Sequence, residues 1–211
     1  MKAPKQRRAP AARPQEIIDA ALAQFVETGF AGTRLDDVAR RAGLSKAAIY
    51  LYFEDKTALF KGVVQHAVAS NLGQVEAMLA GHRGPVAPLL SRILEFMALR
   101  IETSPMASVA KLVISESRAF PEIGQFYLKE VIGRGLPLME GLIRRGVDQG
   151  EFRKVDAFMT VRSMMGPMLL AMLWRTVFEP IGAETLDVQA LARHHADLML
   201  HALRPVAGEA A

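Results

Sequence analysis

The sequence predicts an all-α protein of about nine helices. Apolar residues recur with helical spacing through most of the 211 residues. Breaks that contain glycine or proline separate these stretches, and no alternating apolar and polar run bounded by hairpin turns occurs. We therefore expect an N-terminal three-helix helix-turn-helix domain joined to a larger C-terminal helical bundle.

The composition is that of an ordinary globular protein, with 51% hydrophobic and 23% charged residues. Cysteine is absent, which excludes disulfides, thiolate nucleophiles and zinc sites built from cysteine. The formal net charge of +4 gives weak support for an acidic partner. No uninterrupted apolar run reaches the roughly 20 residues that span a bilayer, and the N-terminus lacks the apolar core of a signal peptide. These features favour a cytoplasmic location and no membrane partner.

Residues 1–13 are predicted to form a basic flexible arm that cannot pack a core. Alanine and proline separate its charged side chains, all of which are cationic: Lys2, Lys5, Arg7, Arg8 and Arg13. Two interpretations stay open, a solvated tail or an arm that touches a polyanion such as DNA.

Two helices are expected over 14–29 and 33–43. Pro14 suits a first helical position, and Gly29 offers a C-terminal stop. Thr33 precedes Asp36 by three positions, which is the spacing of a capping box at the start of the second helix. The small residue Ala39 allows a close helix approach across the following turn.

A third helix over 46–53 follows a tight turn at Gly43, and Ser45 can cap it. About two turns long, it needs tertiary support to be stable. Leu44 and Ile49 are predicted to anchor the turn inward. The outward face then carries Lys46, Ala47 and Tyr50, with Leu51 or Tyr52 beside them, on a rod narrow enough for a DNA major groove. The alternative is a solvated face of a generic helical hairpin.

The segment 29–60, GFAGTRLDDVARRAGLSKAAIYLYFEDKTALF, resembles the DNA-binding domain of the TetR/AcrR family of transcriptional regulators. The residues that carry the resemblance are Gly29, Phe30, Thr33, Ala39, Ala42, Gly43, Leu44, Ser45, Tyr50, Tyr52, Phe53, Asp55, Lys56 and Leu59. The resemblance implies a DNA-binding domain over 14–60 and an effector-binding and dimerisation domain over 61–211.

The resemblance also implies DNA-contacting roles for particular side chains. Thr33 and Lys56 correspond to phosphate contacts, and Ser45 to a capping or backbone contact. The groove-facing positions are Lys46, Ala47 and Tyr50, whereas Tyr52 is either phosphate-facing or packed. Ala47 can touch only a thymine methyl group.

Three positions depart from the family pattern. Arg34 stands where a second threonine is frequent and could add a phosphate or base contact. Ala47 stands where glycine is common, and Leu51 where an aromatic residue often lies. Because these side chains change the recognition surface, the operator sequence cannot be inferred from relatives.

The rest of the chain predicts a helical body. Asp55 can cap a fourth helix that begins at Lys56 and reaches the breaker cluster 81–85. Further helices are expected over 86–103, 106–117, 122–149, 157–178 and 186–203. Residues 119–135 and 142–157 are similar, more weakly, to the same family, which implies a mostly apolar effector pocket.

Candidate pocket residues are the apolar and polarizable side chains of the middle helices. A helical apolar stripe is also what a core requires, so each of them has a core role as its alternative. They are Phe96, Met97, Ile101, Met106, Phe126, Met139, Met165 and Trp174.

The stretch 164–178 is apolar on nearly all sides, which is more than one neighbouring helix can bury. The last predicted helix carries a matching apolar stripe, so a symmetric homodimer is expected. The histidines of the last predicted helix are expected to pack at an interface, and we expect no metal site and no cofactor.

These features predict an effector-responsive transcriptional regulator of double-stranded DNA, most simply a repressor released from a palindromic operator by a small apolar ligand. No catalytic residue is assigned, because neither a nucleophile–base pair, nor paired carboxylates, nor a phosphate loop is found. The alternatives are an architectural DNA-binding protein without an effector and a helical enzyme with an apolar pocket.

Overall fold

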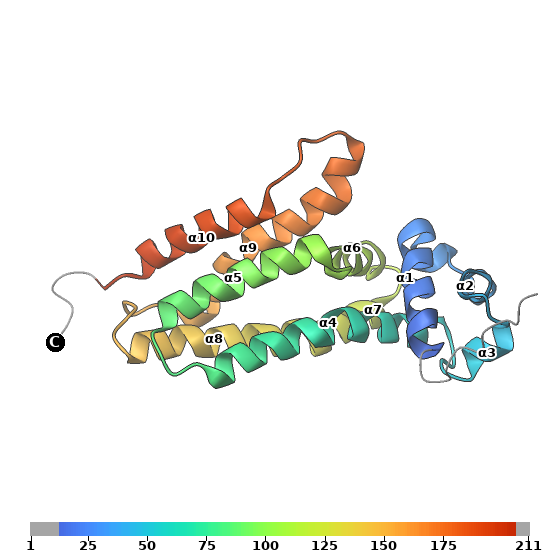
Figure 1. Ribbon diagram of the computed structural model, residues 1–211, viewed down its shortest axis with the longest axis horizontal. Coiled ribbons are helices and arrows are strands. Elements are labelled where there is room, and N and C mark those ends of the chain that lie inside the picture. Colours follow the sequence, from blue (N-terminus) through green and yellow to red (C-terminus); the bar gives the residue numbers. More distant parts are fainter. Residues whose placement is uncertain (1–12, 206–211) are drawn as a thin grey trace, which may run out of the picture. The chain divides into compact units, whose positions relative to one another are not determined.

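The computed structural model describes residues 13–205, and every regular element in this range is a helix (Figure 1). The predicted all-α class is confirmed. Of the predicted basic arm, residues 1–12 lie outside the described residues. The α-helices are α1 (Arg13–Gly32), α2 (Leu35–Ala42), α3 (Lys46–Tyr50), α4 (Lys56–Gly81), α5 (Val86–Thr103), α6 (Met106–Glu116), α7 (Pro121–Tyr127), α8 (Gly133–Asp148), α9 (Ala157–Leu173) and α10 (Val188–Leu203).

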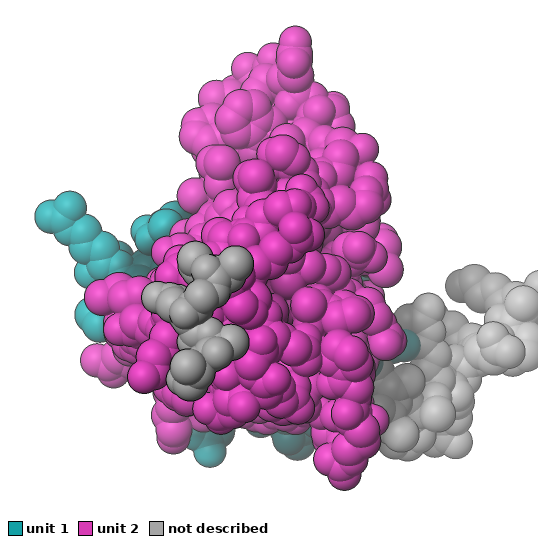
Figure 2. Space-filling view, turned by 90° about the vertical axis from the view of Figure 1, so that its left-hand side faces the viewer, with its two compact units in different colours: residues 1–66, 112–124 teal, residues 67–111, 125–211 magenta. Residues whose placement is uncertain are grey.

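The chain forms two compact units, coloured separately in Figure 2. Unit 1 consists of residues 1–66 and 112–124, and unit 2 of residues 67–111 and 125–211. The sequence suggested a single boundary after residue 60. Unit 1 gains the second segment because the Phe120 ring lies 4.7 Å from the Phe30 ring, a pairing of distant residues that no local pattern predicts.

The core of unit 1 is an aromatic cluster. The ring centroids of Phe25, Phe30 and Phe60 lie 5.3 to 5.6 Å apart, and all three side chains are buried. Stacked or edge-on pairs of this kind add about 0.5–1.5 kcal/mol each beyond the burial of their area. The cluster joins α1 to the start of α4 and so supports the small helices α2 and α3.

The predicted break at Gly29 is present. Gly29 has φ +73°, and the chain makes one further turn before α1 ends at Gly32. The predicted capping box at Thr33 is wrong, because α2 begins at Leu35 with Arg34 in the capping position and no side-chain cap. The Thr33 hydroxyl instead donates to the Gly29 carbonyl at 2.7 Å.

Unit 2 is built around α5, which packs against α8, α9 and α10. Its fully buried residues Leu89, Leu90, Ile93 and Leu94 form the middle of the larger apolar core. The helix expected over 122–149 is present in three pieces, since a five-residue π-helical turn, Leu128–Ile132, separates α7 from α8. The helix expected over 157–178 likewise ends in a π-helical turn, Trp174–Phe178.

One helical segment, Ala157–Ile181, is long and apolar enough to cross a membrane by length and composition. Its most apolar 18-residue stretch has a mean hydropathy of 1.3, and 28% of that stretch is buried. The segment is not an uninterrupted apolar run in the sequence, because Thr160, Arg162 and Ser163 lie within it. Length and composition alone are weak grounds for a span, but the exposed apolar surface needs an explanation.

Candidate nucleic-acid interface

The turn between α2 and α3 is closed by backbone hydrogen bonds that depend on one glycine. Gly43 has φ +68° and ψ +30°, the left-handed conformation that glycine adopts most readily. Its N–H donates to the Arg40 carbonyl at 3.2 Å, and the Leu44 N–H donates to the Ala39 carbonyl at 2.9 Å. Ala39 is buried, as its small size predicted.

Helix α3 is shorter than predicted and ends at Tyr50. The Ser45 hydroxyl oxygen accepts the Ala48 N–H at 3.2 Å, which confirms the predicted cap. Ile49 is fully buried, whereas Leu44 is only half-buried. One buried side chain therefore anchors a helix of five residues, and its remaining surface stays accessible.

The accessible face carries the residues predicted to meet DNA. Lys46 and Ala47 are exposed, and Tyr50 retains 49% of its accessible surface. Leu51 is 80% exposed and Tyr52 40%, which places more apolar and aromatic area beside them. Exposed apolar and aromatic side chains at neighbouring positions mark a candidate interaction surface.

An ion pair links α2 to α3. The Lys46 ammonium lies 3.0 Å from the Asp36 carboxylate, and both side chains are about half exposed. The hydrogen bond that Lys46 donates to the Asp36 carboxylate, and then the negative charge of that carboxylate, raise the pKa of Lys46. An exposed pair of this kind adds little to stability. It does orient the Lys46 side chain, and it leaves N–H groups of the ammonium free for another acceptor.

Sequence reasoning missed the role of Asp36. Ten positions and a tight turn separate it from Lys46, so no helical spacing rule relates the two residues. The sequence predicts a capping-box role for Asp36, but α2 has Arg34 in the capping position and no side-chain cap.

The structure gives Thr33 and Lys56 contacts that differ from phosphate binding. Thr33 is 2% exposed, and its hydroxyl is bonded to the Gly29 carbonyl. The Lys56 ammonium donates to the carbonyl oxygens of Phe30, Ala31 and Thr33 at 2.7, 3.2 and 3.1 Å. An ammonium has three N–H donors, so these acceptors use all of them. Both side chains hold the end of α1 in place.

The environment of Lys56 has two opposing electrostatic effects. Burial lowers the pKa of Lys56, and the charge of Glu116 opposes this shift. The same ammonium lies 4.6 Å from the centroid of the Phe30 ring, a favourable cation–π distance. Glu116 is held near the end of α1, because its Oε1 accepts the Phe30 N–H at 3.1 Å.

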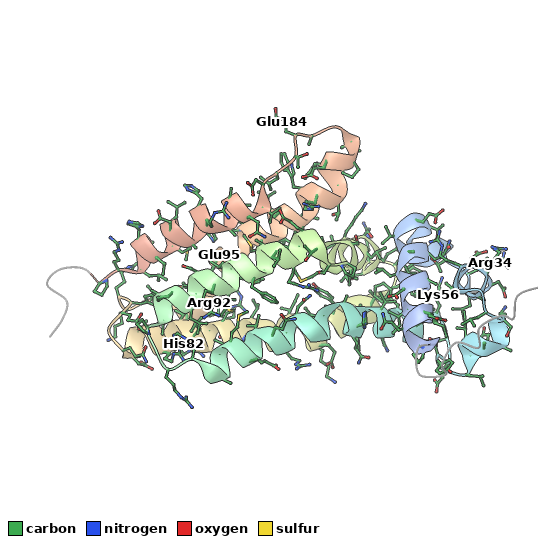
Figure 3. The ribbon with its side chains drawn as sticks, viewed as in Figure 1. Arg34, Lys56, His82, Arg92, Glu95 and Glu184 are labelled. Atoms are coloured by element: carbon green, nitrogen blue, oxygen red, sulfur yellow. The ribbon has the colours of Figure 1, made fainter. Side chains whose placement is uncertain are left out.

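Arg34 is exposed at the start of α2, where Figure 3 labels it. A guanidinium has no acceptor and cannot cap the N–H groups of the helix, so the exposed side chain of Arg34 has no role in starting α2. Tyr52 follows α3, and its N–H is bonded to the Ile49 carbonyl at 2.9 Å. Its side chain is part exposed and part packed, so both predicted roles stay open.

The predicted pocket residues are spread over the core of unit 2. Ile101 and Met139 are buried, and the others for which burial is described are partly buried. Phe96, Met97 and Met165 pack against the larger core cluster, and Met106 against the smaller one. The Trp174 indole N–H donates to the Glu184 carbonyl at 2.8 Å (Glu184 is labelled in Figure 3). Six of the eight side chains therefore belong to the core in the conformation described, whereas Phe126 and Trp174 are partly buried outside the two core clusters.

Among residues 13–205, no three side chains of His, Cys, Asp or Glu come together as a metal site requires. His195 lies 3.0 Å from the Met164 carbonyl, and His201 lies 2.8 Å from the Asp197 carbonyl. These two histidines make helix-to-helix and within-helix contacts.

Comparison with known families matches both parts of the chain. Residues 17–63 match the family described as bacterial regulatory proteins, tetR family. Residues 88–202, more than half of the chain, match the C-terminal domain of AefR-like transcriptional repressors. The first match contains α2, the turn and α3, and the second contains most of unit 2.

Individual relatives are consistent with these family matches. The HTH-type transcriptional regulator RutR of Escherichia coli is 32% identical over 135 residues, 64% of this chain and 55% of that protein. The aligned region thus spans about half the length of that relative. The structure of PfmR from Thermus thermophilus is 26% identical with a TM-score of 0.70, covering 88% of this chain and 97% of that one.

A further similar structure is FadR from Bacillus subtilis in complex with stearoyl-CoA. It has a TM-score of 0.73 over 90% of this chain and 99% of that one, and at 19% identity it shows likeness of fold. Both family matches, together with the helix-turn-helix geometry of α2 and α3, establish the family. This chain belongs to the TetR family of bacterial regulatory proteins.

Proposed function

We propose that this protein is a sequence-specific DNA-binding transcriptional repressor that responds to a small apolar ligand. The observation that carries the proposal is the division of α3 into a buried anchor, Ile49, and an accessible face with Lys46, Ala47 and Tyr50. The relative RutR is named as a transcriptional regulator, and the family match over residues 17–63 covers this face. The proposal requires no catalysis, and it implies a cytoplasmic location because bacterial DNA lies there.

In this proposal α3 enters the major groove of double-stranded DNA. Tyr50 and Lys46 reach base edges, and Ala47 contacts a thymine methyl group. Arg34 and Tyr52 contact the phosphate backbone, while the cap of Ser45 keeps the start of α3 in place beside it. Thr33 and Lys56 act indirectly, since their hydrogen bonds hold the C-terminal end of α1 and so position α2 and α3.

The exposed apolar surface of unit 2 supports a homodimer. Large apolar side chains of the segment 158–181 and of α10 remain accessible, and the exposure of so much apolar area to water is unfavourable. They are Phe158, Met159, Leu169, Leu170, Phe178, Ile181 and Leu198. In a symmetric dimer with a two-fold axis, the same apolar side chains of a second copy would cover them. Two copies of α3 would then match a palindromic operator.

Ligand response follows from a difference in affinity between two states. A ligand that binds better to a dimer with the wrong spacing of α3 helices lowers operator occupancy. The methionine-rich core of unit 2 suits an adaptable apolar site, with the eight predicted pocket residues as candidates. The complex of FadR with stearoyl-CoA shows that a protein of this fold holds a ligand with an apolar chain.

Selection of bound duplexes from random DNA, followed by titration of purified variants, tests the DNA-binding proposal. Lys46→Ala and Tyr50→Ala should lose preference for the selected duplex over random DNA. Lys129→Ala is the matched control, because this exposed lysine lies in unit 2. Equal binding of all duplexes by the unaltered protein would favour the architectural alternative instead.

Sedimentation of unit 2 variants in the full chain tests the homodimer. Leu169→Glu places a charge within the apolar patch and should shift the protein to monomers at micromolar concentration. Leu128→Glu is the control, since this leucine is 58% exposed and lies outside the patch. A monomeric unaltered protein, or an unchanged dimer in Leu169→Glu, contradicts the proposed interface.

A further inference from the structure

The side chain of Arg145, near the end of α8, is only partly satisfied. Its Nη1 donates to the His82 carbonyl at 3.3 Å, at the turn between α4 and α5 where Figure 3 labels His82. Its Nε and Nη2 atoms are buried and have no hydrogen-bond partner. A buried donor without a partner costs about 1–3 kcal/mol, and more when the group is charged. Such a group needs an explanation.

The free donors form one edge of the guanidinium plane. The N–H bonds of Nε and Nη2 run parallel on that edge, and their spacing matches the two oxygens of a carboxylate. The third nitrogen, Nη1, already donates to the His82 carbonyl. The part of Arg145 left without an acceptor is therefore the part that binds dioxoanions in a bidentate manner.

No carboxylate of the described residues neutralises this charge. Glu151 lies nearby in sequence, but its two oxygens accept the N–H groups of Val86 and Ala87 at 2.8 to 3.1 Å. The neighbouring Arg144 has the ion-pair partner that Arg145 lacks, since it binds Glu140 at 2.9 Å. The C-terminal end of α8 supplies only a partial negative charge, about half an elementary charge.

Arg145 also lines a groove in unit 2. The groove is shallow and open to solvent, with a volume of about 270 Å³, and the residues that line it besides Arg145 are apolar: Leu79, Pro137, Leu138, Gly141 and Leu142. An apolar groove with a cationic side chain in its wall is complementary to an amphipathic anion. Its volume is slightly below that of typical ligand pockets, which run from roughly 300 to 1,000 Å³, so only a small ligand fits.

We propose that this groove binds a small monocarboxylate with a short apolar chain. The carboxylate pairs with the free edge of Arg145, and the chain lies along the leucines of α4 and α8. A single unpaired cation favours a monoanion, because a phosphate dianion would leave a surplus buried charge. Arg145 reaches the ligand by rotation about its outer torsions, which moves the covered edge toward the groove.

Titration calorimetry of the full-length protein without DNA tests this site, so its result is separate from that of the proposed repressor function. The probes are hexanoate, hexanol and hexyl phosphate. Hexanoate should bind to the unaltered protein, and hexanol should bind about tenfold or more weakly, because it lacks the charge-assisted hydrogen bonds. Absence of hexanoate binding, equal binding of hexanol, or tighter binding of hexyl phosphate would overturn the proposal.

Two variants locate the site. Arg145→Met removes the guanidinium and keeps an apolar stem, and Gly141→Leu fills the groove without touching Arg145. A Cβ atom at Gly141 meets no atom within 4 Å, and leucine favours a helix, so this variant should fold. Both should weaken hexanoate binding about tenfold or more.

Matched controls complete the test. Gly135→Leu makes the same change at another open glycine of α8, outside the groove, and Arg144→Met removes the neighbouring paired arginine. Both should bind hexanoate as the unaltered protein does. Hexanoate binding that persists in Gly141→Leu, or that is lost equally in Gly135→Leu, would place the ligand elsewhere. The 15N resonance of Arg145 Nε should also shift on addition of hexanoate, and a resonance that stays in place contradicts direct contact.

Discussion

The Lys56 ammonium donates a 2.7 Å hydrogen bond to the Phe30 carbonyl and lies over the ring of the same residue, 4.6 Å from its centroid. One side chain of α4 thus closes the C-terminal end of α1 and faces the aromatic core of unit 1. The family resemblance implied a phosphate contact for this lysine. The geometry supports an indirect role in DNA binding, through the position of α2 and α3.

Lys56→Met should therefore destabilise unit 1 by about 1–2 kcal/mol, because the carbonyls at the end of α1 lose a charged donor. The variant should bind its operator more weakly, since α2 and α3 are held less firmly. The dependence of log K on log salt should nevertheless keep its slope, because no phosphate contact is removed. Urea unfolding and binding titrations at several salt concentrations measure these quantities.

The opposite pattern identifies a phosphate contact at Lys56. In that case the slope would fall by about 0.9, as expected for one phosphate neutralised, with unfolding free energy unchanged. Arg34→Ala is the comparison variant, since our proposal assigns its guanidinium to the DNA backbone and predicts the reduced slope there.

Gly43→Ala should destabilise the protein by about 1–2 kcal/mol, the cost of a side chain in the left-handed conformation. An added Cβ meets no atom within 4 Å, so strain of the backbone is the sole cause. Gly43→Asn should cost less, because asparagine tolerates this conformation. Gly73→Ala in α4 is the control, and there the change should be neutral or stabilising. Equal unfolding free energies for Gly43→Ala and the unaltered protein would refute the assignment of this turn.

Stability should fall at alkaline pH because of Tyr127. Burial raises the pKa of its phenol above the ordinary value of 10.0. The unfolded chain loses this proton first, so between the ordinary and the raised pKa the folded chain binds more protons, and stability declines as pH rises. Tyr127→Phe should show a shallower decline of the urea midpoint between about pH 9 and pH 11. An identical decline in both proteins means that Tyr127 does not contribute.

The features predicted well from the sequence are those set by local chemistry. The cap of Ser45, the cap of Asp55 on the Ala58 N–H at 2.7 Å, and the left-handed Gly43 depend on residues within a few positions of one another. Spacing and side-chain type are then sufficient. The α-helical class and most helix bounds follow from the same periodicity.

The features that the sequence could not predict depend on residues far apart in the chain. Lys56 bonds carbonyls 23 to 26 positions away, and Glu116 bonds the N–H of Phe30 at a separation of 86. The family resemblance implies a phosphate contact for Lys56 and gives no sign of these contacts within the protein. The unpaired edge of Arg145 likewise cannot be predicted from the sequence, because it depends on which acceptors the fold places near the guanidinium.

The most direct measurement of the proposed function uses the absence of cysteine from the chain. Ala47→Cys adds one thiol to the outward face of α3, and an iron chelate attached to it cleaves DNA within reach. We predict cleavage confined to the major groove of each half of the selected operator, whereas Lys129→Cys, in unit 2, gives none. Cleavage from Lys129→Cys but not from Ala47→Cys, on an operator that both proteins bind, would contradict recognition by α3.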